Sequence, residues 1–165
     1  MRKAALAVAI MTITTGTAWA QTATAPVTTA TDPEEGEYVV SGSGFALYTF
    51  KADVRGSANA PARSACEGEC LDAWPPLLVS EPPVGDGNIR AELLGTIVRS
   101  DGTTQVTYNG WPLYFYAEDT QPSDIKGNDI EEFGEDWYLI GPNGNRSDRD
   151  DENARRKGRD DRDED

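Results

Sequence analysis

Short runs of β-branched and aromatic residues, separated by Gly, Pro, Asn and Asp, dominate the middle of this chain. No helical periodicity of apolar positions persists over about eleven residues, the shortest window in which an amphipathic helix can be recognised. Runs of this kind, bounded by turn-forming residues, are typical of β-strands. The pattern therefore predicts an all-β fold in one small domain.

Two dipeptides give the clearest turn signals, Asp101-Gly102 and Asn109-Gly110, and each lies between two runs of strand character. Both dipeptides favour the primed turns, whose twist matches that of the flanking strands. They predict a three-stranded meander over residues 95–117. Residues 89–94 are expected to form one short helical turn.

An internal repeat is the most informative feature of the sequence. The segment LYTFKAD at 47–53 aligns with LYFYAED at 113–119, and an acidic residue near a tryptophan follows each copy, at Trp74 and at Trp137. Self-similarity of this kind predicts related structural units that pack against each other. We expect two β-repeats, at about 38–80 and 95–143, arranged as a sandwich or a meander.

Each repeat carries a tyrosine, a second aromatic residue and an aspartate at fixed spacing. The two aromatic residues share one face of a strand, whereas the aspartate is expected in the turn after it, accepting a backbone N–H about two residues on. We interpret this motif as structural, with a ligand or cation role for the aspartates as the alternative. The motif residues are Tyr48, Phe50 and Asp53, and Tyr114, Tyr116 and Asp119.

The first twenty residues have the pattern of a secretory signal peptide. Arg2 and Lys3 precede an apolar run over 4–13, and Ala18-Trp19-Ala20 provides a cleavage pattern. The run is shorter than the roughly 20 residues that span a hydrocarbon core, so we expect a protein that does not span the membrane. Gln21 is the expected first mature residue, and since it is not cysteine, no lipid anchor is expected. The predicted location is the bacterial periplasm or the medium.

Both flanks of the predicted domain have low-complexity composition. Residues 21–36 are expected to form a flexible Ala/Thr/Pro spacer, and residues 144–165 a disordered charged tail. Residues 146–165 include seven basic and nine acidic residues and contain no aromatic or large aliphatic side chain. This tail is interpreted as a solubilising extension, with a docking arm for a charged partner as the alternative. The ordered domain is predicted over 37–143.

Charge and composition narrow the function classes. The formal net charge is −14, and residues 21–145 contain six basic against twenty acidic side chains, which disfavours binding to nucleic acid or to an anionic membrane. The chain has no histidine, and both methionines, Met1 and Met11, lie in the predicted signal peptide. Haem, type-1 copper, most zinc sites and His-based nucleophilic catalysis are then improbable, so no cofactor is expected.

The two cysteines, Cys66 and Cys70, form a C-x3-C segment. In an exported protein such a pair is expected to form a disulfide. The alternative is a redox-active pair, which the flanking Glu67 and Glu69 disfavour because they oppose thiolate formation. So short a loop contributes only about 2 kcal/mol on the chain-entropy model. The bond is therefore expected to fix a local turn.

The acidic segment 118–136 is a candidate for weak calcium binding, because hard cations take several oxygen ligands from a flexible loop. Its spacing does not match the EF-hand pattern, so a solvated loop is the preferred interpretation. The weak candidate ligands are Asp119, Asp124, Asp129 and Glu131.

Aromatic residues could form a platform for sugars or for another polypeptide, but a domain this small needs most of them in its core. A carboxylate-based hydrolase is a further alternative, although no spacing assigns an acid or a nucleophile, so we assign no catalytic residue. The aromatic candidates are Trp74, Trp111, Trp137, Tyr108, Tyr114, Tyr116 and Tyr138.

The two Tyr-x-aromatic-x-x-Asp segments, with Cys66, Cys70 and Trp74-Pro75-Pro76-Leu77 between them, resemble the bacterial secreted repeat family of unknown function. Its members are also described as predicted lipoproteins with a Y-x-(F/W/Y)-x-x-D motif. The resemblance spans about 38–143 and implies export, tandem repeats and an envelope location, but no reaction. Because the chain has a signal-peptide pattern and a duplicated motif but no histidine, we expect a non-enzymatic protein that binds or scaffolds an envelope protein or glycan.

Overall fold

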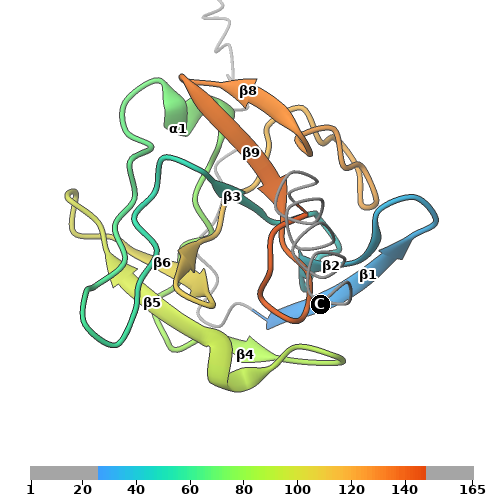
Figure 1. Cartoon of the computed structure of the whole chain (residues 1–165), viewed down its shortest axis with the longest axis horizontal. Coiled ribbons are helices and arrows are strands. Elements are labelled where there is room, and N and C mark those ends of the chain that lie inside the picture. The colour runs from blue at the N-terminus through green and yellow to red at the C-terminus, as the bar shows by residue number, and fades with distance from the viewer. Residues whose placement is uncertain (1–25, 148–165) are drawn as a thin grey trace, which may run out of the picture.

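The computed structural model describes residues 26–147, and almost all of its regular structure is strand (Figure 1). This confirms the predicted all-β fold. The predicted signal peptide, its cleavage site and residues 148–165 of the charged tail lie outside the described residues. Between residues 26 and 147, no helix is long and apolar enough to cross a membrane.

The strands form three small sheets of three strands each. The first has the order β2-β1-β4, with β1 at Pro26–Asp32, β2 at Gly36–Ser41 and β4 at Val84–Gly85. The second has the order β3-β9-β8, with β3 at Tyr48–Phe50, β8 at Ile130–Glu132 and β9 at Glu135–Leu139. The third has the order β5-β6-β7, with β5 at Leu94–Val98, β6 at Thr104–Tyr108 and β7 at Trp111–Pro112. The helical elements are α1 at Cys70–Ala73 and the 3-10 helix η1 at Ala91–Leu93.

The third sheet is the predicted meander, and η1 lies within the predicted helical turn. Asn109 and Gly110 both have positive φ, 49° and 81°, as a type I′ turn requires. At the other turn only Gly102 has positive φ, and its N–H donates to the Arg99 carbonyl at 3.0 Å. The expected primed turn at Asp101-Gly102 is therefore wrong, because the connection is one residue longer and closes with a glycine bulge.

The predicted flanks are too long at both ends. Residues 26–32 form β1 and pair with β2 along its length, so the flexible spacer is wrong for this part of 21–36. The physical reason is that Val27 is fully buried in the core and its β-branched neighbours suit a strand. At the other end, Ser147 N–H donates to the Leu139 carbonyl at 2.9 Å, so residues 144–147 belong to the domain and not to a disordered tail.

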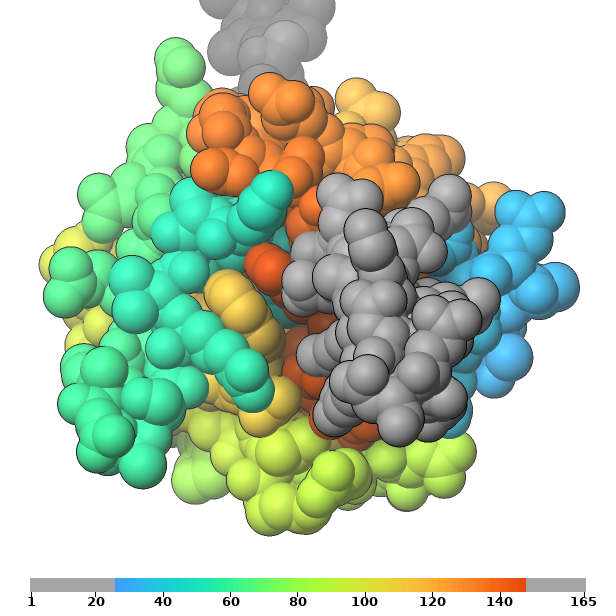
Figure 2. All heavy atoms as spheres, in the orientation of Figure 1, coloured from blue at the N-terminus to red at the C-terminus, as the bar shows by residue number. Residues whose placement is uncertain are grey.

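Residues 54–63 form a hairpin-like arm that leaves the domain after β3. Isolated bridges pair Val54 with Arg63 and Ser57 with Ala60, and the Gly56 N–H donates to the Gly110 carbonyl at 2.9 Å. The arm is thereby fixed to the turn between β6 and β7. Figure 2 shows this segment at the surface, in teal, on the same side of the molecule as the yellow-green β5.

Candidate functional site

The two motif segments meet at the centre of the domain. Tyr48 and Tyr114 form an antiparallel bridge in which each N–H donates to the other residue's carbonyl, at 2.8 and 3.0 Å. On one side, β3 pairs with β9, which places Phe50 opposite Trp137. On the other side, the second motif pairs with the segment after α1, where Tyr114 lies opposite Pro76. Each motif therefore pairs with the tryptophan segment of the other repeat.

The tyrosine and aspartate side chains are exchanged in the same way. Tyr48 Oη donates to Asp119 Oδ2 at 2.7 Å, and Tyr114 Oη donates to Asp53 Oδ2 at 2.9 Å. Both tyrosines are fully buried, and the aspartates are only 6% and 4% exposed for Asp53 and Asp119 respectively. We call these two hydrogen bonds the Tyr–Asp latches. Each latch joins the tyrosine of one repeat to the aspartate of the other.

The second oxygen of each aspartate closes a loop in its own repeat. Asp53 Oδ1 accepts the Ala65 N–H at 2.7 Å, and Asp119 Oδ1 accepts the Lys126 N–H at 3.0 Å. The first motif forms β3, whereas the second forms only isolated bridges at Tyr114 and no strand. Each aspartate nevertheless closes a turn after its motif, since the Asp53 N–H donates to the Phe50 carbonyl at 3.2 Å and the Asp119 N–H to the Tyr116 carbonyl at 3.1 Å. The expected amide about two residues on is wrong, because each loop folds back and brings an amide from 12 or 7 residues on.

Four rings stack beside the latches, and they alternate between the repeats. Ring centroids are 4.2 Å apart for Phe50 and Trp137, 3.8 Å for Trp137 and Trp74, and 4.2 Å for Trp74 and Tyr116. Tyr48 contacts the Trp74 ring edge-on at 5.5 Å, whereas Tyr114 contacts Trp137 in the same way at 5.2 Å. Sequence comparison aligned the two tryptophans but did not predict this stack. Its alternation buries aromatic surface of both repeats together.

Burial sets the ionisation of the latches. Desolvation raises the pKa of Asp53 to about 7, against the opposing effect of its hydrogen bonds and of the Arg99 charge. Burial also raises the pKa of Asp119, despite its hydrogen bonds to Tyr48 and Lys126. The pKa values of Tyr48 and Tyr114 are raised too, first by burial and then by the partner carboxylates. Both tyrosines therefore keep their protons and act as hydrogen-bond donors.

A buried arginine that sequence analysis missed supports the first latch. The Arg99 guanidinium donates to the Cys66 carbonyl at 2.7 Å, to Ser64 Oγ at 2.8 Å and to Gln105 Oε1 at 2.6 Å. Ser64 Oγ also lies 2.8 Å from Tyr114 Oη. No motif marks Arg99, which follows an ordinary strand in the sequence. Its contacts link the Tyr114 latch to the backbone of the disulfide loop.

The cysteines form the expected disulfide between Cys66 and Cys70, with their Cα atoms 5.4 Å apart. Both are buried, and Cys70 begins α1. Cys66 directly follows Ala65, whose amide is held by Asp53. The disulfide therefore fixes the turn that closes the loop after the first motif.

The weak calcium ligands are not brought together. Both Asp119 oxygens are used by the latch and by the loop amide. Asp124 Oδ2 lies 3.1 Å from the Lys126 ammonium and accepts the Thr120 N–H at 2.9 Å. Together with Asp129 and Glu131 they do not form a cation site, and within residues 26–147 no group of three or more His, Cys, Asp or Glu could hold a metal ion.

The aromatic candidates are mostly core residues. Six of the seven are buried, whereas Trp111 is half-buried at the surface. Two guanidinium groups lie over the Trp111 ring, with Arg146 Cζ at 4.5 Å and Arg55 Cζ at 5.9 Å from the ring centroid. The rings therefore do not form the exposed platform that was the alternative prediction.

A comparison with protein families shows which family this chain is related to. A family model described as a secreted repeat of unknown function matches residues 29–78 and 95–140, and each matched segment contains one Tyr–Asp motif. No curated protein and no solved structure gives a significant match. The two matched segments cover more than half of the chain and overlap the two predicted repeats, although the first segment begins at residue 29, before the predicted start at about 38. The chain therefore belongs to the family of secreted repeats of unknown function.

Proposed function

We propose that this protein acts in the bacterial periplasm or outside the cell as a non-enzymatic binding or scaffolding protein. One observation carries the proposal: the residues that recur in the repeats are hydrogen-bonded to each other and to the main chain inside the core. The need to join the two repeats explains why the same residues recur in both. The outer surface is then left to make the functional contacts.

The two motif carboxylates are poorly placed for contact with a substrate. A glycosidase acid and its partner must both reach the scissile bond, and their oxygens must be available to it. Asp53 and Asp119 are almost fully buried, and each carboxylate accepts hydrogen bonds on both oxygens. This arrangement supports a structural role for the motif.

The charge of the surface favours certain partners. Residues 26–147 contain twenty acidic and seven basic side chains, which disfavours polyanions such as nucleic acid as general ligands. Large apolar side chains are nevertheless exposed at Val54, Val84, Val98 and Phe133. These features support a protein or glycan of the envelope as the partner.

The proposal is tested in a bacterium that exports the chain. Fractionation should place the protein in the periplasm or the medium, and photo-crosslinkers at exposed Val98 or Phe133 should capture one defined envelope component. A crosslinker at exposed Glu34, in the turn between β1 and β2, serves as a matched position elsewhere on the surface. Hydrolytic or redox turnover that Asp53→Asn or Asp119→Asn abolishes without unfolding the protein would contradict the proposal.

A further inference from the structure

Strand β5 is an unprotected sheet edge. It is the outer strand of the order β5-β6-β7, and no other described segment pairs with it. The Val106 N–H donates to the Leu77 carbonyl, and the Val106 carbonyl accepts the Leu113 N–H, so the Val106 backbone points away from β5. Thr96, which is paired with Val106, therefore directs its own N–H and C=O outward, and so does Val98.

This edge lacks the usual features that prevent pairing. Strands at a sheet edge are commonly protected by proline, by charge or by a bulge. The sequence of β5 is LGTIV, Thr96 is exposed, and the Val98 side chain is 75% exposed. Two outward N–H and two outward C=O groups are thus presented beside an apolar side chain.

Hollows lie on both faces of this edge. One, of about 690 Å³, lies between β5 and the arm and is lined by Ile97 and Thr107. The other, of about 350 Å³, is lined by Leu94 and Thr104. The side chains of these two pairs point to opposite faces of the sheet, and Gly95 and Thr96 line both hollows. An added strand would place its alternate side chains into the two hollows.

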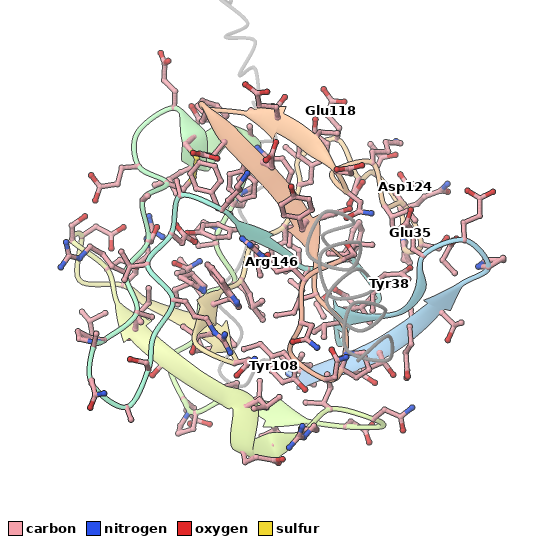
Figure 3. The ribbon with its side chains drawn as sticks, in the orientation of Figure 1. Glu35, Tyr38, Tyr108, Glu118, Asp124 and Arg146 are labelled. Atoms are coloured by element: carbon pink, nitrogen blue, oxygen red, sulfur yellow. A yellow bond between two sulfur atoms is a disulfide. The ribbon has the colours of Figure 1, made fainter. Side chains whose placement is uncertain are left out.

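The charges around the larger hollow differ from those of the rest of the domain. Arg63 lines it, and Arg55 donates to the carbonyl of Asn109, another lining residue, at 2.8 Å. Its one lining carboxylate, Glu92, is paired with Arg90 at 2.8 Å. Acidic Glu35, Glu118 and Asp124 lie instead on the side of β1 and β8 (Figure 3). The larger hollow is therefore complementary to negative charge.

The smaller hollow has a different chemistry. It is lined by Pro82, Pro83, Ala91 and Leu94, with Glu81 as its charged residue. Small apolar side chains fit it better than acidic ones. The two faces of β5 thus select alternate acidic and apolar residues.

From this geometry we infer that the β5 edge binds an extended, acidic segment of a partner polypeptide, which adds to the sheet as a further strand. Main-chain hydrogen bonds to Thr96 and Val98 provide affinity, and the two hollows bind alternate side chains of the segment and so provide specificity. The inference deepens the proposed binding function and rests on it.

The test uses the full chain, labelled with ¹⁵N, and a blocked synthetic peptide of alternating Glu and Val. When nine tenths of the protein is bound, amide exchange at Thr96 and Val98 should slow about tenfold, because only the free fraction exchanges. Exchange at Gly95 and Ile97, whose amides face β6, should not change. No slowing at millimolar peptide overturns the inference.

Two variants test separately the contribution of the β5 edge and that of the Arg63 charge to peptide binding. Thr96→Pro removes an outward N–H that β6 does not use, so the fold should remain and peptide binding should be lost, whereas the matched Thr96→Val should bind normally. Arg63→Glu should weaken binding of the acidic peptide about tenfold, as a loss of charge complementarity predicts. A peptide of alternating Lys and Val that binds equally well overturns the acidic specificity.

Other occupants give distinct outcomes. Protection of Thr96 in the free protein that disappears on removal of 148–165 identifies the chain's own terminus, and protection that rises with protein concentration identifies a second copy. Either result overturns the inference. An envelope partner that crosslinks only at Phe133 overturns it too, while leaving the proposed binding function intact.

Discussion

The two latches are equivalent in topology but not in their surroundings, and this predicts unequal effects of removing each hydroxyl. In Tyr48→Phe the Asp119 carboxylate loses its donor, and the Gly127 N–H, which donates to Tyr48 Oη at 3.3 Å, loses its acceptor. In Tyr114→Phe the Asp53 carboxylate loses its donor in the same way, and each aspartate keeps its loop amide. Ser64 Oγ, which loses Tyr114 Oη, keeps its hydrogen bond from Arg99, so no buried group is left without a partner. Tyr48→Phe should therefore be the more destabilising change.

The magnitudes follow from the groups left unpaired. A hydrogen bond to a charged group contributes about 1.5–3 kcal/mol, and a buried donor without a partner costs about 1–3 kcal/mol. We expect Tyr48→Phe to lower the free energy of unfolding by about 3 kcal/mol and Tyr114→Phe by about 1.5 kcal/mol. The smaller value also reflects Asp53, whose pKa of about 7 lets it take up a proton once the tyrosine donor is gone.

Urea unfolding at pH 8, followed by tryptophan fluorescence with the disulfide intact, measures both changes. Unchanged m-values are required for the comparison, since a changed slope signals a different unfolded or native ensemble. Phe50→Leu is a matched control, because it changes the stack without touching a latch. Equal effects of the two Tyr→Phe changes, or effects below about 0.5 kcal/mol, would show that the unpaired groups do not set the stability of the latches.

Further outcomes are expected from the same domain. Folding raises the pKa of Asp53 from 3.8 to about 7. The stabilisation that comes from protonated Asp53 is therefore complete below about pH 4 and is lost as the pH rises through 7. In urea titrations, the free energy of unfolding of the wild type relative to Asp53→Asn should fall between pH 5 and pH 8. Trp137→Ala should cost about 3–5 kcal/mol, measured by thermal unfolding, since it removes a ring between two stacked neighbours; a loss below about 1 kcal/mol would argue against the stack. Reduction of the Cys66–Cys70 bond should lower stability by only about 2 kcal/mol, and complete unfolding on reduction would show that the bond holds more than its local turn. Gly110→Ala should destabilise by about 1–3 kcal/mol, read from the urea midpoint, because φ is 81° and an added Cβ would meet the Gly56 carbonyl; a neutral result would mean that the arm can move away.

Local pattern predicted the elements that depend on local chemistry. Alternation and turn residues predicted the strand class, the meander, the Asn109-Gly110 turn and the position of Asp53 in the turn after β3. Self-alignment gave the two repeats. These features follow from side-chain period and backbone preference, which a single sequence contains.

What the sequence did not predict is the exchange between repeats. Tyr48 and Asp53 stand in one motif, yet Tyr48 bonds Asp119, because antiparallel pairing of Tyr48 with Tyr114 places each tyrosine under the other repeat's turn. Such pairing depends on long-range register, which local spacing does not encode. Arg99 was missed for a related reason, since two of its three partners, Ser64 and Cys66, lie more than thirty residues away.

Low-complexity composition misled the assignment of the flanks. Residues 26–32 look like part of a Thr-rich spacer, but Val27 is a core residue and the threonines lie on a paired strand. A segment with few large apolar residues can still order when a neighbouring strand supplies the pairing. Composition alone therefore placed the start of the domain too late.

Reciprocal Tyr–Asp hydrogen bonds hold the two repeats together, and a pair of double-mutant cycles measures this coupling. The cycle between Tyr48→Phe and Asp119→Asn crosses the repeats, whereas the cycle between Tyr48→Phe and Asp53→Asn stays within one motif. The structure predicts a coupling free energy above about 1 kcal/mol for the first cycle and additivity within about 0.5 kcal/mol for the second. Strong coupling within the motif, with none across the repeats, would show that the Tyr–Asp bonds do not hold the repeats together.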